Sequence, residues 1–249
     1  MSEHQEKEIM SYIQERQFAT VSQIASDLYV SPSTVRRKLA KLQRSGFITR
    51  TRGGAKINDS SNLLPSFSFR THQNSLEKKK IAMSATQLIK NGDVIFLDGS
   101  TSAFFIAEYL SGFKDIKVIT NGLDTLSLLA KNGIDAYSTG GWLLKSSNSA
   151  LVGEHAINMI NRFHADVTFF SAASVTNDGR IYDIFEEENP VRLAMFKNSS
   201  KIVFLSDSTK YGKVSPYYIC DISNVDYIVS DIDISKKFNS GIKLPEIVY

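Results

Sequence analysis

A chain of 249 residues is long enough for one large domain, or for a small domain followed by a medium one. Its hydrophobic share of 42% is ordinary for a globular protein, and no run of about 18 apolar residues suggests a membrane span. The single cysteine excludes an internal disulfide framework, and the acidic, polar N-terminus does not resemble a signal peptide. We therefore expect a cytoplasmic location.

The net charge of +3 is unevenly distributed along the chain. Residues 31–56 contain several Lys and Arg residues but no Asp or Glu, so the remainder is mildly acidic. Such asymmetry predicts a polyanion partner, double-stranded DNA, for the N-terminal part alone.

Two helices are predicted before this basic stretch. Residues 3–16 have the apolar periodicity of a first helix. Thr20 and Gln23 have the spacing of a capping box, which starts a second, short helix. A tight connection then leads to Ser31, which is a good N-cap for a third helix that ends near Gly46.

The third helix is predicted to have one apolar stripe and a basic remainder, which suits the major groove of DNA. A solvated basic face is the alternative. A short helix, a turn and a basic helix in succession form a helix-turn-helix pattern, in which the last helix reads base edges. The expected DNA-binding residues here are Ser31, Ser33, Thr34, Arg36, Arg37, Lys38 and Lys41.

Residues 47–56 predict a β-hairpin, because an alternating, β-branched run is broken at Gly53-Gly54. Such a hairpin would form a wing beside the groove, with Arg50 and Arg52 on the phosphate backbone. The alternative is an ordinary hairpin that closes a small helical core. The cap, the turn and the charge together favour a winged helix-turn-helix domain at residues 1–57, followed by a linker at residues 58–75.

Residues 76–249 predict an α/β domain with a largely parallel sheet, because short apolar runs alternate with helical ones. A helix is expected over residues 77–91. Further helices are expected at 101–111, 123–132, 150–162 and 191–199, and strands at 94–98, 116–120, 134–138, 166–170, 201–206 and 226–230. Residues 232–249 show no clear pattern.

Polar, loop-forming segments follow several of these strands, where open α/β sheets bind ligands. The hydroxyls and backbone amides of these segments suit a small phosphorylated polyol. Asp98 and Asp207 could accept hydrogen bonds from its hydroxyls. Lys210 could hold an anionic group. Taken singly, each segment is better explained by helix capping, turns or salt bridges. The segments contain Asp98, Ser100, Thr101, Ser102, Asn121, Gly140, Gly141, Asp207 and Lys210.

The chain resembles the DeoR family of bacterial transcriptional repressors over nearly its whole length. The signature VS-x-x-T-[IV]-RR-D-L is matched from Val30 to Leu39, with Lys38 where the family usually has Asp. The family's GGA wing motif is matched by residues 53–55, and its D-S-G-T-T loop is altered here to DGSTS at residues 98–102. Lys78 and Glu188 also stand at recurrent family positions.

This resemblance implies a repressor of sugar metabolism or uptake genes whose Rossmann-like C-terminal domain is similar to pentose-phosphate isomerases and senses a phosphorylated sugar. Ser100, Thr101 and Ser102 would bind the phosphate, with Lys78 or Lys210 as charge partners. We expect a homodimer or higher homo-oligomer, and an effector that shifts the population of domain arrangements.

Two other functions stay open at this stage. One is a sugar-phosphate isomerase with an appended DNA-binding domain, although the segment after residue 170 lacks the acid-rich loop of such isomerases. The other is an architectural DNA binder with an oligomerisation domain. The histidines have no metal-ligand spacing and no nucleotide-binding motif occurs, so we expect no metal, no cofactor and no catalysis.

Overall fold

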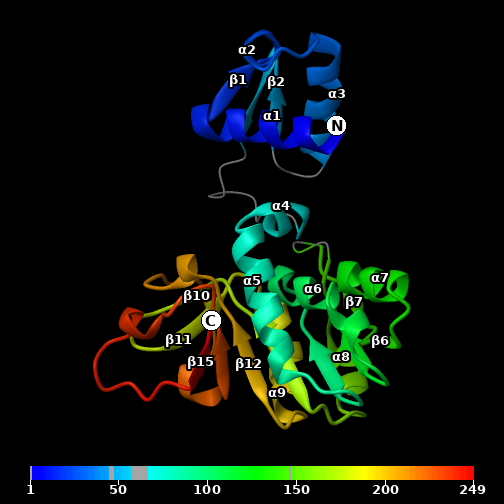
Figure 1. The fold of residues 1–249 in the computed structure, drawn as a ribbon, viewed down its shortest axis with the longest axis vertical. Coiled ribbons are helices and arrows are strands. Elements are labelled where there is room, and N and C mark those ends of the chain that lie inside the picture. The colour runs from blue at the N-terminus through cyan, green and yellow to red at the C-terminus, as the bar shows by residue number, and fades with distance from the viewer. Residues whose placement is uncertain (1, 45–47, 58–66, 146, 148) are drawn as a thin grey trace. The chain divides into compact units, whose positions relative to one another are not determined.

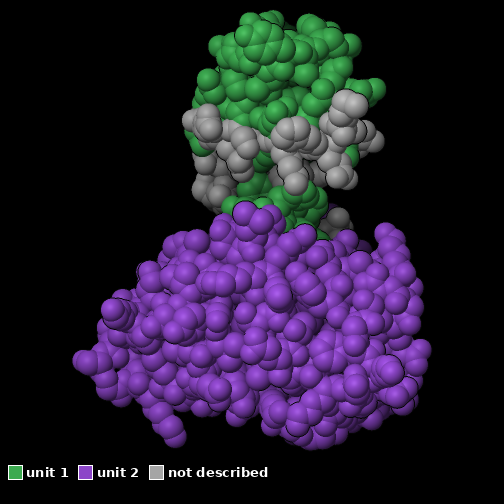
Figure 2. Space-filling model, viewed as in Figure 1, with its two compact units in different colours: residues 1–73 green, residues 74–249 purple. Residues whose placement is uncertain are grey.

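The computed structural model describes residues 2–44, 48–57, 67–145, 147 and 149–249. The chain divides into two compact units, residues 1–73 and residues 74–249, called here the N-terminal unit and the C-terminal unit (Figure 2). No helix within the described ranges is long and apolar enough to cross a bilayer.

The N-terminal unit combines helices with a small antiparallel sheet (Figure 1). The sheet has the strand order β1-β3-β2, so the predicted wing pairs with the strand that follows the first helix. The elements are α1 (Ser2–Arg16), β1 (Phe18–Thr20), α2 (Val21–Asp27), α3 (Pro32–Arg44), β2 (Ile48–Thr51), β3 (Gly54–Ile57) and α4 (Phe67–His72).

The core of this unit confirms the predicted apolar faces. Ile13 of α1, Ile24 of α2 and Leu39 of α3 are completely buried and belong to one cluster. The capping box of Thr20 and Gln23 is present: each side chain accepts a hydrogen bond from the other's backbone N–H. The helix-turn-helix is therefore held by a local cap and by a shared hydrophobic core.

The predicted end of α3 at Gly46 and the linker residues 58–66 lie outside the described residues. Residues 67–72 of the predicted linker form α4, and Phe69 of this helix packs against the core of the N-terminal unit. The boundary between the two compact units falls between Gln73 and Asn74.

The C-terminal unit is built on a seven-stranded sheet in the order β15-β14-β12-β9-β4-β5-β6, in which every pair of neighbours is parallel. The predicted parallel α/β architecture is thereby confirmed. The strands are β4 (Val94–Leu97), β5 (Lys117–Thr120), β6 (Ala136–Ser138), β9 (Val167–Ser171), β12 (Ile202–Leu205), β14 (Tyr227–Val229) and β15 (Glu246–Val248).

Helices cover both faces of this sheet, as the alternation of side chains along β4 requires. Ile95 and Leu97 pack in one cluster with residues of α5, α6 and α7, whereas Phe96 packs in another with residues of α8 and α9. The helices are α5 (Ser75–Ala85), α6 (Thr101–Ala107), α7 (Leu123–Lys131), α8 (Glu154–Ile160) and α9 (Asn189–Lys197).

Several elements differ from the prediction. The helix expected over residues 77–91 is shorter, since α5 ends at Ala85 and continues only as a 3-10 turn over Thr86–Leu88. The first residues of the helix expected at 150–162 form the strand β8 (Leu151–Val152), which pairs with β7 (Trp142–Leu143). The unassigned C-terminal segment adds β15 to the edge of the sheet.

A second, antiparallel sheet was missed altogether. It has the order β10-β11-β13, formed by β10 (Ser174–Val175), β11 (Arg180–Asp183) and β13 (Tyr217–Asp221). Its first strand begins three residues after the end of β9. It therefore lies close to the carboxyl ends of the parallel strands, where the candidate ligand site is found.

Candidate DNA-binding face and sensor site

The start of α3 is fixed by Ser31, as predicted. The Thr34 N–H donates to Ser31 Oγ at 3.2 Å, and the Val35 N–H donates to the Ser31 carbonyl at 3.0 Å. Ser31 Oγ also lies 2.9 Å from the hydroxyl oxygens of both Ser33 and Thr34. These three expected DNA-binding residues form one hydroxyl cluster at the N-terminus of the helix that a groove would receive.

Basic side chains extend from both α3 and the wing. Arg36 and Arg37 are exposed on α3, and Arg50 and Arg52 are exposed at β2 and the adjoining turn. Lys41 is also exposed, although its Nζ forms an ion pair with Glu6 Oε2 at 2.8 Å. The N-terminal unit thus presents guanidinium groups from two adjacent elements, as a winged reader of DNA requires.

Lys38 departs from the expectation. Its side chain is buried, and its Nζ donates to Glu6 Oε1 of α1 at 2.7 Å. Burial alone would raise the pKa of Glu6, but the hydrogen bonds and charges of Lys38 and Lys41 lower it below its usual 4.5. Because this ammonium group points into the unit, we withdraw Lys38 from the DNA-binding face and assign it to the packing of α3 on α1.

The tip of the wing is tied to the helix-turn-helix. The Val21 N–H at the start of α2 donates to the Gly53 carbonyl at 2.8 Å. An added Cβ at Gly54 would lie 2.5 Å from the Ala19 carbonyl oxygen, so only glycine allows β3 to approach β1 this closely. The Gly53-Gly54 pair therefore sets the position of the wing that carries Arg50 and Arg52.

In the C-terminal unit, the strand order reverses between β4 and β9. The chain goes from β4 outward to β5 and β6, then returns to β9 on the other side of β4 and continues to β12 and β14. Ligands of open α/β sheets bind outside the carboxyl ends of the strands at such a point. Asp98, directly after β4, and Ser171, at the end of β9, lie there.

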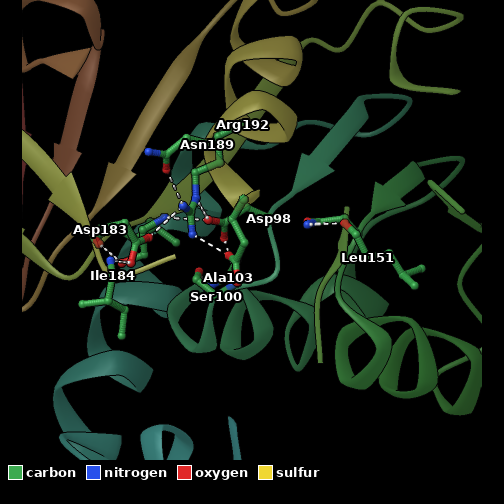
Figure 3. Close-up of polar contacts among 12 residues, drawn as sticks. Asp98, Ser100, Ala103, Leu151, Asp183, Ile184, Asn189 and Arg192 are labelled. Atoms are coloured by element: carbon green, nitrogen blue, oxygen red, sulfur yellow. Dashed lines mark hydrogen bonds and ion pairs between the residues drawn. The ribbon is translucent and has the colours of Figure 1, made fainter. Parts of the chain in front are cut away.

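Asp98 is completely buried and connects these two strand ends. Its Oδ1 accepts the Ser100 N–H at 3.0 Å, and its Oδ2 accepts the Ser171 N–H at 3.2 Å. Arg192 Nε on α9 also donates to Asp98 Oδ2 at 3.0 Å (Figure 3). Asp98 is thus an ionic and hydrogen-bonding anchor of the site.

Arg192 binds two more carboxylates besides Asp98. Its Nη1 lies 2.7 Å from Asp183 Oδ2 (Figure 3). Its Nη2 donates to Glu188 Oε2 at 2.7 Å. Burial alone would lower the pKa of Arg192, but the three carboxylates raise it, so the guanidinium stays protonated. Asp98 and Glu188, both expected at the site, are thereby brought together by an arginine that sequence reasoning did not select.

A second part of the network follows β12. Lys210 Nζ donates to Ser171 Oγ at 2.6 Å, which links it to the Asp98 group. Asp207 Oδ1 accepts the Thr209 N–H at 3.1 Å and Nδ2 of Asn74 at 3.2 Å. Burial would raise the pKa of Asp207, but the charge of Lys210, the bonds to Thr209 and the charge of Lys78 lower it.

Lys78 on α5 is buried, and its charge, like that of Lys210, acts on the Asp207 carboxylate. The expected residues Lys78, Asp207 and Lys210 therefore meet, and Ser171 joins them to Asp98. Asn74 and Ser171 were not predicted. Neither carried a local signal, because both act through partners far away in the sequence.

The DGSTS segment forms the start of α6. Ser100 is its N-cap and accepts the Ala103 N–H at 3.2 Å, and Thr101 and Ser102 are buried in its first turn. An added Cβ at Gly99 would lie 3.1 Å from Cβ of Ala150, so the early glycine accommodates the segment that follows β7. Among the described residues, Ser102 Oγ and Asn121 Oδ1 are buried without a hydrogen-bond partner.

Gly140 and Gly141 lie further out. They follow β6, have φ values of 63° and 100°, and turn the chain toward β7. The Gly140 N–H donates to Ser138 Oγ at 3.1 Å. Within the described ranges, no hydrogen bond connects this pair with the network of Asp98, Ser171, Lys210 and Asp207. An added Cβ at Gly141 would lie 2.3 Å from the Val152 carbonyl oxygen, so the turn and the close approach of β8 account for these glycines.

Asp183 and Arg192 are two further functional candidates that the sequence did not reveal. Arg192 lies among Val191, Ala194 and Met195 on the buried side of α9, so a charge within an apolar stripe was the available signal. Asp183 ends β11, a strand that was itself missed. In the described part of the chain, no group of three or more His, Cys, Asp or Glu residues is placed to hold a metal ion.

Comparisons with known proteins agree with both units. A model of the DeoR-like helix-turn-helix domain matches residues 6–61, and a model of the DeoR C-terminal sensor domain matches residues 73–232. The winged basic face and the network at the strand ends thus belong to a DNA-binding transcriptional regulator with a sensor domain. The chain belongs to the DeoR family.

Three relatives match nearly the full length. The regulator GolR of Listeria innocua is 34% identical, covering 93% of this chain and 91% of its own. The repressor GlcR of Bacillus subtilis is 32% identical, covering 90% and 86%. The L-fucose operon activator of Haemophilus influenzae is 30% identical, covering 90% and 89%.

Two solved structures are similar in fold. The eIF2B-β2-δ2 complex of Chaetomium thermophilum has a TM-score of 0.50 at 14% identity, covering 64% of this chain and 56% of that chain. Ribose 5-phosphate isomerase A of Methanocaldococcus jannaschii has a TM-score of 0.43 at 17% identity, covering 57% and 56%. The first likeness concerns the fold alone, and the second carries no functional argument.

Proposed function

We propose that this protein regulates genes of sugar metabolism or uptake, and that a phosphorylated sugar bound at the carboxyl ends of β4, β9 and β12 controls its affinity for DNA. The observation that carries the proposal is the connected network from Arg192 through Asp98 and Ser171 to Lys210 and Asp207. It lies at the switch point of a domain whose family is defined as a sensor.

The network combines the two kinds of group that a sugar phosphate needs. Lys78 and Lys210 supply positive charge for a phosphate, and carboxylate, amide and hydroxyl oxygens supply partners for sugar hydroxyls. Ser102 Oγ and Asn121 Oδ1 have unused hydrogen-bonding capacity. One relative is the activator of an L-fucose operon, which supports a sugar-linked operon as the regulated target.

We infer that the chain binds this ligand without converting it. An isomerase needs a carboxylate that can take up a proton from the substrate. Asp98, Asp183 and Glu188 are all ion-paired with the one buried guanidinium of Arg192, so these carboxylates are engaged in structural contacts rather than placed as a base beside a substrate. Absence of turnover of ribose 5-phosphate by the pure protein is the expected result.

The ligand class is tested by thermal shift with ribose 5-phosphate, glucose 6-phosphate, fructose 6-phosphate and mannitol 1-phosphate, each beside its unphosphorylated parent. At least one phosphate is expected to raise the melting temperature of the C-terminal unit, while its parent does not. Lys210→Ala should weaken that binding about tenfold or more, because a charge-assisted bond is lost. Equal shifts by phosphate and parent would contradict the proposal.

We propose a homodimer or higher homo-oligomer, because a helix-turn-helix protein covers a two-fold operator with two copies. Light scattering on the full chain, with and without a duplex from upstream of its own gene, measures this. A monomer bound to a single half-site would contradict it.

A further inference from the structure

Tyr29, in the turn between α2 and α3, has a backbone conformation that its own side chain disfavours. Its φ is 53°, in the left-handed region that residues with a Cβ rarely adopt. Glycine or asparagine would hold the same turn with less strain. A bulky aromatic residue at this position therefore needs a reason.

Packing within the unit does not supply one. The neighbours Leu28 and Val30 pack against the core, and the Val30 N–H donates to the Ala25 carbonyl at 3.0 Å, so the turn itself is firmly held. Tyr29, in contrast, is 96% exposed. Tyr12 of the same unit is only 8% exposed, so Tyr29 is not an aromatic residue of this core.

The position of Tyr29 indicates a role at the DNA interface. It stands two residues before Ser31, the N-cap of α3, and the exposed Arg36 and Arg37 follow on that helix. The N-terminal residues of a recognition helix reach base edges in the groove while the preceding helix crosses the sugar-phosphate backbone, so the turn that holds Tyr29 joins these two contacts. Tyrosine hydroxyls are among the groups that bind DNA phosphates.

We propose that Tyr29 is a DNA-backbone contact. Its phenol donates a hydrogen bond to a phosphate at the edge of the groove that α3 enters, and the strained turn holds the ring outward for this purpose. Residues in unfavourable backbone conformations occur where function requires them. The contact is neutral, so it adds affinity without releasing a counterion.

The test uses the full chain and a random-sequence duplex at low salt, because a backbone contact does not depend on base sequence. Tyr29→Phe removes only the hydroxyl and should weaken binding about tenfold. Tyr29→Asn should weaken it at least as much, yet raise the melting temperature of the N-terminal unit by about 4 °C, because strain is relieved. The melting temperature of the N-terminal unit is recognised with Leu39→Ala, which removes a buried side chain of that unit's core and lowers the transition that belongs to it.

The dependence of affinity on salt separates this contact from an ionic one. Both Tyr29 variants should keep the wild-type slope, whereas Arg36→Ala should reduce its magnitude by about 1. Gln17→Asn is the matched control, since Gln17 has a similar φ of 62° in the same unit and should leave DNA affinity unchanged. Wild-type affinity in both Tyr29 variants, or a lower melting temperature for Tyr29→Asn, would overturn the proposal.

Discussion

Arg192 joins three segments of the C-terminal unit through buried ion pairs. Three carboxylates from three segments, Asp98, Asp183 and Glu188, converge on its guanidinium. A buried ion pair is not strong evidence of stability in itself, because desolvation offsets the attraction. Removing one partner is different, since the remaining charges then lie buried without compensation.

Arg192→Met should therefore lower the free energy of unfolding of the C-terminal unit by about 3–5 kcal/mol, measured by urea denaturation. Lys197→Met, an exposed position on the same helix, is the control. Equal stability of the two variants would contradict this account of the cluster.

Among single residues, those with local signals were predictable. Ser31 was predicted as the N-cap of α3 from the residues next to it, and its hydroxyl oxygen accepts the Thr34 N–H as expected. Lys38 was wrongly assigned to the DNA-binding face. A helical projection of α3 distinguishes its apolar positions from its polar ones, but it does not show that Glu6 of α1 lies next to Lys38. Asn74 and Ser171 escaped notice for the same reason, since their partners are more than thirty residues away.

At the scale of elements, Glu6 joins α1 to the recognition helix by ion pairs with Lys38 and Lys41. Glu6→Gln would remove the charge that pairs with both Lys38 and Lys41, and should lower the stability of the N-terminal unit by about 1–3 kcal/mol at pH 7. Because the pKa of Glu6 is lowered on folding, the stabilisation is present above its usual 4.5 and disappears as the pH falls through the folded-state value.

The difference between wild type and Glu6→Gln should thus shrink between pH 5 and pH 3. Denaturant unfolding across this range measures it, with Glu8→Gln on the same helix as the control, because Glu8 is exposed. A difference that stayed constant down to pH 3 would mean that the Glu6 charge does not carry the effect.

The recognition helix α3 makes a prediction about salt. Arg36→Ala should weaken DNA binding without affecting sugar-phosphate binding, because the exposed guanidinium lies on the N-terminal unit. If the wild-type complex neutralises about six phosphates, log affinity should fall with log salt at a slope of roughly −5, and the variant's slope should be smaller in magnitude by about 1. Filter binding at four salt concentrations measures both values, and unchanged affinity would contradict the assignment.

Elements were predictable where their signals lie within a few residues. The capping box, the apolar stripe of α3 and the Gly53-Gly54 turn are all local, and the winged domain followed from them. In the sheet β10-β11-β13, β11 pairs with β13 across more than thirty residues, so that pairing has no local signal. The hairpin of β10 and β11 did have one, because the Asn-Asp-Gly turn at residues 177–179 joins the two strands, and the prediction overlooked it. The strand β15 was missed because its partner β14 defines it.

At the scale of the whole molecule, the residue at which the chain enters the C-terminal unit is tied to the candidate sensor site. Asn74 is the first residue of the C-terminal unit and has a φ of 51°. Its Nδ2 donates to Asp207 Oδ1 at 3.2 Å and to Thr209 Oγ1 at 3.1 Å. The network that we propose to bind the sugar phosphate therefore holds the residue at the domain boundary directly.

This arrangement predicts that Asn74 contributes to the coupling between sites. Coupling is the factor by which sugar phosphate changes DNA affinity, and it equals the factor by which DNA changes sugar-phosphate affinity. Asn74→Gly keeps the left-handed backbone accessible but removes both side-chain bonds, so this factor should fall toward 1 while each ligand alone still binds. Both affinities are measured by fluorescence anisotropy and calorimetry, with and without the other ligand.

Asn74→Ala separates the side chain from the backbone, because alanine loses the same bonds and also disfavours the positive φ. If the bonds to Asp207 and Thr209 carry the signal, glycine and alanine should uncouple the sites equally. If the backbone conformation carries it, only alanine should do so. A glycine variant with wild-type coupling would therefore show that the signal leaves the sensor site by another route, even though the network reaches the boundary residue.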